Sequence, residues 1–114
     1  MSVELYDGEA LVIVYSTFPE MGAAQAVGRG LVEAGLAACV NLLPGMVSIY
    51  AWQGTVETAD EIVFLAKTRA VLAEAAMAAI RVAHPYEVPA LVVLPIASAA
   101  RAYGDWICGE TDAG

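Results

Sequence analysis

Two kinds of hydrophobic pattern alternate along the chain. Residues 10–18 form an unbroken apolar run rich in β-branched and aromatic side chains, which is typical of a buried strand. Residues 20–34 carry small and apolar side chains at helical spacing on one face, and Gly35 is suited to end a helix there. Because Gly28 and Gly30 each lower helix stability, we expect this helix to pack closely against a neighbouring element.

A long hairpin is predicted next. Residues 36–43 and 46–53 read as one strand that bends at the Pro44-Gly45 pair, because proline has no N–H to donate to a neighbouring strand. Gly54 marks a turn, and residues 56–68 read as the returning strand. The two strands therefore form a hairpin with a bulge in its first strand.

The last third of the chain predicts a helix, a strand and a short helix. Thr68 is suited to cap a helix over residues 69–83, which two prolines then stop. Residues 90–96 read as a fourth strand, and Ser98 is suited to cap a short C-terminal helix.

The order of elements predicts the fold. Strand, helix, strand, strand, helix, strand is the order of the ferredoxin-like split βαβ arrangement, an α+β fold with two helices on one face of a four-stranded antiparallel sheet. The chain shows no linker, so residues 1–114 are expected to form one domain. The apolar runs at 11–14 and 36–40 do not alternate with polar residues, so both sheet faces are expected to be buried. We predict that the second face contacts another subunit.

Composition supports an oligomer. The chain is 60% hydrophobic and only 16% charged, with a mean hydropathy of +0.66, whereas soluble domains carry about 25% charged residues. A domain of this size buries only about two thirds of the surface that its unfolded chain exposes. No apolar stretch reaches the roughly 20 residues of a membrane span. We therefore expect a soluble oligomer and no membrane partner.

Charge and cysteine content narrow the class further. The formal net charge is −8, which argues against nucleic acid as a partner because binding phosphates requires clustered Lys and Arg. Two cysteines do not make a disulfide framework. The expected compartment is the cytoplasm.

Motifs of phosphate-binding, hydrolytic and zinc enzymes are absent, and the least ordinary stretch is HPYEVP at residues 84–89. It reads either as a rigid connection from helix to strand or as a fixed loop that presents His84, Tyr86 and Glu87 to a ligand or metal.

Cys39 and Lys67 each allow two interpretations. Cys39 is either a buried inert thiol or a soft metal ligand. Lys67 shares a strand face with Glu61 and is either a solvated cation at the sheet edge or an anion-binding group in a cleft between subunits. Four large aromatic residues are either core or subunit anchors: Tyr50, Trp52, Tyr103 and Trp106.

Several motifs follow one another in the order of a known family. They are LAACVN at 36–41, the Pro44-Gly45 pair, SIYAWQG at 48–54, Lys67-Thr68, HPYEVP at 84–89 and LPI at 94–96. Together they resemble the CutA family, the divalent-cation tolerance proteins, over nearly all of residues 12–106.

The resemblance implies a ferredoxin-like subunit, a tight homotrimer similar in architecture to the PII signalling proteins, and a role in copper tolerance. We therefore expect a non-enzymatic homotrimer that binds copper, another divalent cation or a small anion at or near subunit clefts. The expected cleft residues are Glu61, Lys67, Tyr86 and Glu87, and the expected interface residues are Tyr50, Trp52 and Trp106.

The resemblance also implies a copper site, formed in some members by a Cys in the loop of the first strand and two consecutive His before a Pro. Ser16 and Ala83 stand at two of these positions, so only His84 carries over. His84 and Cys39 are the candidate metal ligands. The alternative function is a small hydrolase or transferase that uses Cys39 together with His84.

Overall fold

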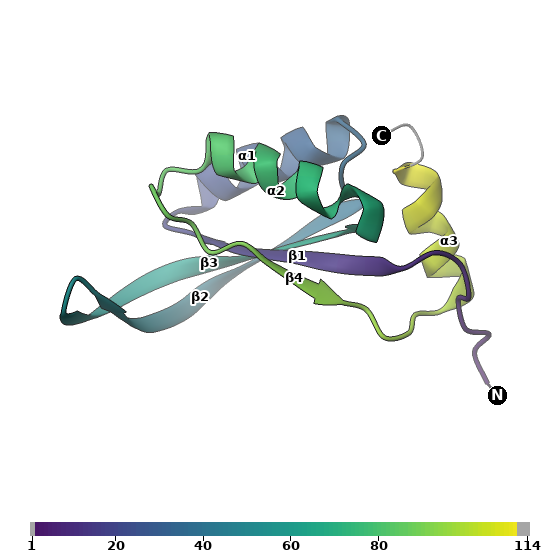
Figure 1. Cartoon of the computed structure of the whole chain (residues 1–114), viewed down its shortest axis with the longest axis horizontal. Helices are drawn as coiled ribbons and strands as arrows, with labels where there is room; N and C mark the ends of the chain where they lie inside the picture. The colour runs from purple at the N-terminus through teal and green to yellow at the C-terminus, as the bar shows by residue number, and fades with distance from the viewer. Residues whose placement is uncertain (1, 112–114) are drawn as a thin grey trace.

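The computed structural model describes residues 2–111 and has the predicted architecture (Figure 1). One antiparallel sheet has the strand order β2-β3-β1-β4, which confirms the ferredoxin-like arrangement. The elements are β1 (Leu11–Phe18), α1 (Met21–Glu33), β2 (Cys39–Trp52), β3 (Thr55–Arg69), a 3₁₀ turn (Ala70–Leu72), α2 (Ala73–Ala83), β4 (Val92–Pro95) and α3 (Arg101–Glu110).

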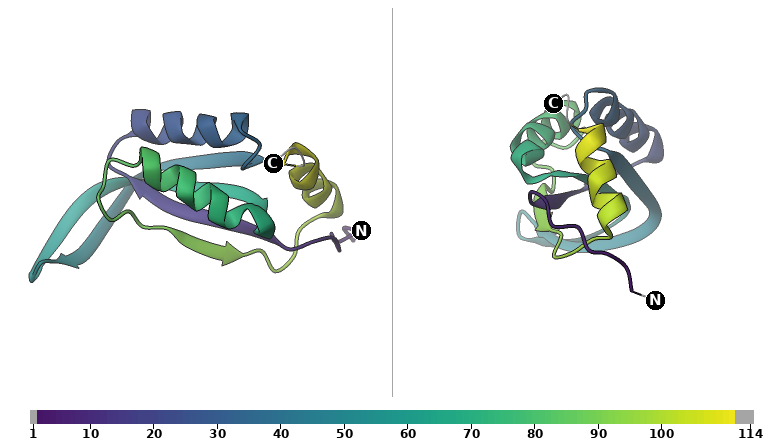
Figure 2. Two further views of the ribbon diagram at one scale, coloured as in Figure 1. Left: turned by 45° about the horizontal axis from the view of Figure 1, so that its top comes forward. Right: turned by 90° about the vertical axis from the view of Figure 1, so that its right-hand side faces the viewer.

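Helices α1 and α2 lie side by side on one face of the sheet and enclose the main core (Figure 2). Phe18 and Phe64 are fully buried there, with ring centroids 5.1 Å apart. A Cβ on Gly28 would lie only 3.1 Å from Val40, which confirms the close packing expected at that glycine. Gly30 has open space around it, so the same expectation is wrong there. No helix in residues 2–111 is long and apolar enough to cross a membrane.

The helix ends agree only partly with the predicted caps. Gly35 ends α1 in the left-handed conformation, with Leu36 N–H donating to the Leu31 carbonyl at 2.9 Å, as predicted. Thr68 does not cap a helix, because β3 continues past it and its side chain is fully buried opposite Val12. Ser98 does not cap α3 either, since that helix begins after Ala100 without a side-chain cap.

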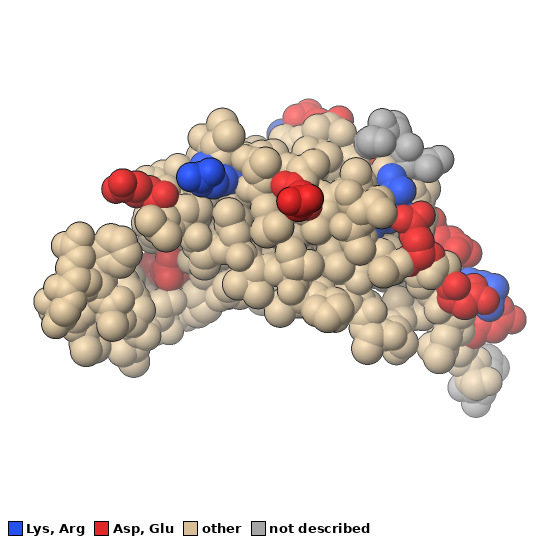
Figure 3. Space-filling view, viewed as in Figure 1, with Lys and Arg blue, Asp and Glu red and all other residues tan. Residues whose placement is uncertain are grey.

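The outer parts of β2 and β3 project beyond the helices as a two-stranded arm, residues 46–61 (Figures 1 and 2). A bulge between Leu43 and Met46 precedes the arm, with Gly45 at φ +87°. The arm lengthens the molecule to 48 Å and raises its radius of gyration to 15.2 Å, against about 13 Å for a compact chain of this length. The arm tip shows no charged side chain on the visible face in Figure 3.

The second face of the sheet is covered only at one end. There α3 packs Ile107 against Leu11 and Ala38 (Figure 2, right). Farther along the same face, Val92 and Leu94 are 46% and 41% exposed. The chain exposes 6832 Å² in total, whereas a compact monomer of this mass exposes about 6,000 Å². A single copy therefore leaves an apolar sheet face in solvent.

Candidate functional site

The main candidate site is a cleft of about 660 Å³ between the arm and the segment that follows α2. We call it the arm cleft. Three parts of the fold form its walls. β1 supplies the floor, the arm that follows the bulge at Gly45 forms one side, and residues 85–90 form the other. The lining residues are Tyr15, Thr17, Ser48, Ile49, Tyr50, Trp52, Glu61, Pro85, Tyr86, Glu87, Val88 and Ala90.

A buried carboxylate and a phenol meet in the arm cleft. Tyr86 Oη donates a hydrogen bond to Glu61 Oε2 at 3.1 Å. The Glu61 residue is only 8% exposed, and no Lys, Arg or His of the described chain pairs with its carboxylate. Burial, together with the hydrogen bond to Glu61, raises the pKa of Tyr86 to about 12. The arm cleft therefore holds a negative charge that no protein cation neutralises.

Three of the expected cleft residues come together, and the fourth does not. Glu61, Tyr86 and Glu87 line the arm cleft. Lys67 shares the face of β3 with Glu61 but stands six residues farther along the strand, about 20 Å away. Sequence reasoning missed Tyr15 and Thr17, which line the floor of the cleft. Side chains alternate between the two faces along β1, so the sequence could have predicted that Tyr15 and Thr17 lie on the face that the helices do not cover.

His84 is a structural residue in this chain, which contradicts its expected role as a metal ligand. Its Nε2 donates to the Thr17 carbonyl at 2.7 Å, and its Nδ1 accepts from the Tyr86 N–H at 3.0 Å. The ring also stacks on Phe18, with centroids 4.2 Å apart, and the residue is 9% exposed. Since both ring nitrogens are engaged, neither offers a lone pair to a metal.

Cys39 and Lys67 lie at the opposite end of the sheet with Tyr103. Lys67 Nζ donates to Tyr103 Oη at 3.1 Å, and Cys39 Sγ lies 3.5 Å from the same oxygen. The hydrogen bond to Tyr103 raises the pKa of Lys67. Cys39 is half-buried, so it is not the fully enclosed thiol of the first interpretation. The second interpretation, a soft metal ligand, stays a prediction.

Cys39 and His84 do not form a catalytic pair. The strand register places Cys39 in the row of Ile13, whereas His84 contacts Thr17, four residues along β1 and about 13 Å away. A nucleophile and its base must lie within hydrogen-bond reach. No three His, Cys, Asp or Glu side chains cluster as metal ligands within residues 2–111. Neither the hydrolase alternative nor a Cys39–His84 metal site is supported.

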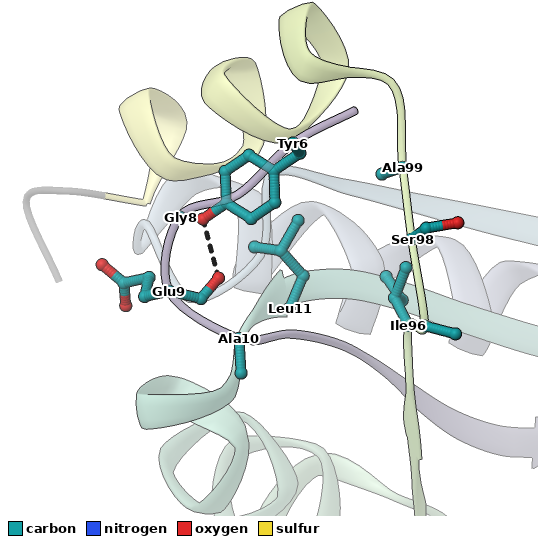
Figure 4. Close-up of a pocket in the computed structure, with 9 residues that line it drawn as sticks. Tyr6, Gly8, Glu9, Ala10, Leu11, Ile96, Ser98 and Ala99 are labelled. Atoms are coloured by element: carbon teal, nitrogen blue, oxygen red, sulfur yellow. Dashed lines mark hydrogen bonds between the residues drawn. The ribbon is translucent and has the colours of Figure 1, made fainter. Parts of the chain in front are cut away.

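A second, smaller cavity of about 170 Å³ lies beneath the N-terminal segment (Figure 4). Tyr6 closes it, packs against Gly104 of α3 and donates to the Glu9 carbonyl at 2.7 Å. The hydrogen bond to Cys108 and burial raise the pKa of Tyr6 to about 12. We interpret this cavity as the junction that holds residues 4–9 against α3.

Two tyrosines should therefore ionise late in alkaline solution. The folded state favours the neutral phenols of Tyr6 and Tyr86, so their contribution to stability is present below pH 10 and is lost as the pH rises from about 10 to about 12. Spectrophotometric titration of tyrosinate should show a late component near pH 12. Tyr86→Phe should remove about half of that component and leave the part due to Tyr6. A late component unchanged in Tyr86→Phe would contradict the Glu61–Tyr86 contact.

Comparison with known sequences places the chain. Residues 12–110 match the profile of the family described as "CutA1 divalent ion tolerance protein". The divalent-cation tolerance protein CutA of Thermus thermophilus is 42% identical over 99 residues, which cover 87% of this chain and 96% of that protein. A CutA homolog of Xenopus laevis is 38% identical over 107 residues, which cover 94% of this chain and 71% of that protein.

Solved structures of CutA proteins have the same fold as this chain. CutA from Xylella fastidiosa superposes with a TM-score of 0.87 at 40% identity, covering 90% of this chain and 98% of that one. CutA from Synechococcus elongatus gives 0.89 at 31% identity, with 95% and 96% covered. The family is named for tolerance of divalent cations, and that name describes no catalysed reaction. By its motifs, its fold and these relatives, the chain belongs to the CutA family of divalent-cation tolerance proteins.

Proposed function

We propose that the chain is the subunit of a non-enzymatic homotrimer that contributes to tolerance of divalent cations and binds a cationic ligand in the arm cleft. The observation that carries this proposal is the Glu61 carboxylate, which lies nearly buried in a large cleft without a protein cation. The assembly and the ligand are argued separately below.

The assembly rests on two different apolar surfaces. One is the second sheet face with Val92 and Leu94, and the other is the outer side of the arm, where Ile49 and Val56 are both 74% exposed. If the arm of one copy packs on the sheet face of the next, the contact joins unlike surfaces. Contacts between unlike surfaces form a ring when the rotation from one copy to the next closes. We propose a ring of three subunits, the smallest ring beyond a two-fold dimer.

The aromatic residues expected at the interface are partly exposed in a single copy. Tyr50 and Trp52 line the arm cleft yet stay 43% and 48% exposed, so a neighbouring copy has room to cover the remainder. Trp106 is 42% exposed and stacks on Tyr103 at the far end of the second sheet face. We propose that all three are buried further on assembly, as aromatic anchors commonly are.

The charge of the arm cleft favours a cation over the small anion that the sequence also allowed. Glu61 and Glu87 line the cleft, and no Lys or Arg does. Lys67, the expected anion-binding group, is bonded to Tyr103 at the other end of the sheet. The net charge of −8 attracts cations generally.

Among metals, we propose weak binding of copper or another divalent cation at the Glu61 carboxylate, with Glu87 at the rim. Two carboxylates fall short of the three or four convergent ligands of a tight site. We also propose the cytoplasm as the compartment, because Cys39 and Cys108 are both free thiols and reducing conditions preserve such thiols.

Copper titration by calorimetry tests the metal part. We expect a Kd in the micromolar range or weaker, about −8 kcal/mol at best, and a further loss of at least tenfold in Glu61→Gln. The control Cys39→Ala should bind as the native protein does. Nanomolar affinity that disappears in Cys39→Ala would show instead that a thiolate at the other end of the sheet holds the metal.

A further inference from the structure

The geometry points to a preference of the arm cleft for small organic cations, in particular methylated ammonium groups. Three tyrosines line the cleft on the side of one nearly buried carboxylate, Glu61: Tyr15, Tyr50 and Tyr86. Trp52 also lines the cleft, but it stands six residues farther along the arm, about 20 Å from Glu61. The inference rests on the proposed function in one respect, namely that the arm cleft is the ligand site. It adds the chemical class of the ligand.

The aromatic lining of the cleft favours a methylated ammonium group over a metal ion. The face of an aromatic ring carries a negative potential, and a diffuse cation such as a methylated ammonium gains from several such faces at once. A metal ion gains most from oxygen, nitrogen or sulfur ligands, and the cleft offers it the Glu61 carboxylate and little else at depth. The methyl groups of an organic cation also bury apolar surface against the rings of Tyr15 and Tyr86.

The electrostatics select a cation among organic molecules. Glu61 Oε2 accepts one hydrogen bond, from Tyr86, and a phenol does not neutralise the carboxylate. A ligand that carries a positive charge supplies the missing counter-charge, whereas a neutral molecule of the same shape leaves it uncompensated. The volume of about 660 Å³ lies within the usual range of small-molecule sites, roughly 300–1,000 Å³.

The cation has to come from outside the chain. Lys67 is bonded to Tyr103, and Arg69 to Glu9 and Thr111. Arg101 pairs with Glu4 and Asp7 at the end of the molecule where the N-terminal segment lies. Arg29 and Arg81 lie on α1 and α2, which cover the other face of the sheet. Within one copy, therefore, none of these cations lies in the arm cleft beside Glu61.

Two matched probes test the inference on the intact protein. Choline carries a trimethylammonium group, and 3,3-dimethylbutan-1-ol has the same shape with a neutral carbon in place of nitrogen. We expect choline to shift the ring signals of Tyr86 in NMR spectra and to leave those of Tyr103, at the other end of the sheet, in place. The neutral alcohol should bind at least tenfold more weakly. Glu61→Gln should weaken choline binding at least tenfold. Asp60→Asn, at an exposed carboxylate on the opposite face of the same arm, should not.

The outcomes separate this inference from the proposed function. Equal binding of choline and the alcohol, or choline binding unchanged in Glu61→Gln, overturns the inference. Copper binding lost in Glu61→Gln with no choline binding also overturns it, while the cleft remains the cation site. Choline binding by a protein whose light-scattering mass is that of a monomer supports the inference and rejects the trimer, because one chain supplies every lining residue.

Discussion

Replacing Ile49 and Val56 together by aspartate should convert the trimer into folded monomers. Both side chains are 74% exposed, and the strand register places them on the face of the arm opposite that of Tyr50 and Trp52, although Ile49 also borders the arm cleft. If they are buried on assembly, each interface loses about 3–6 kcal/mol of apolar burial and gains two carboxylates that have no partner. Light scattering should give a mass near 11.9 kDa, with a circular dichroism spectrum like that of the native protein.

The control is a second pair of exposed valines. Val71 and Val82 are 72% and 89% exposed, but they lie on the helix layer and not on the arm. The double variant Val71→Asp/Val82→Asp should keep the native mass. If it dissociates as readily as the arm variant, the added charge and not the arm surface governs assembly.

His84→Ala should destabilise the metal-free protein by about 3–5 kcal/mol. The substitution leaves the Thr17 carbonyl and the Tyr86 N–H without partners and removes a ring that stacks on Phe18. Denaturant unfolding at equal subunit concentration, with a chelator present, measures the loss. His84→Gln keeps a donor for the Thr17 carbonyl and should lose less.

The same variant decides between two roles for this histidine. A metal ligand would contribute little to stability once the metal is removed, so a metal-free His84→Ala protein as stable as the native one would contradict the structural role. We also expect the copper affinity of folded His84→Ala to stay within about threefold of the native value.

The order of the elements was predictable because strand and helix patterns differ in period and alternate here without ambiguity. The element ends were less so. Thr68 and Ser98 have side chains suited to a helix cap, but pairing with Val12 keeps Thr68 in β3, and α3 begins only after Ala100. Local preference therefore yielded to the sheet and to the position of α3.

The candidate site was predictable in its residue types and not in its distances. Glu61 and Tyr86 were both singled out, and the fold brings them to 3.1 Å. His84 was a candidate metal ligand because it matches one position of the copper site that the family resemblance implies. The sequence gives no sign of which groups will face its nitrogens. Its partners, Thr17 and Phe18, lie more than sixty residues away in the sequence and are defined only by the packing of α2 on β1.

The most direct measurement of the central claim is the mass of the native protein on dilution. Light scattering or analytical ultracentrifugation at submicromolar subunit concentration should give three times 11.9 kDa, because an interface that buries both the second sheet face and the arm is of the obligate class. A mass of 11.9 kDa at micromolar concentration would show that the exposed sheet face and arm do not join copies of this chain.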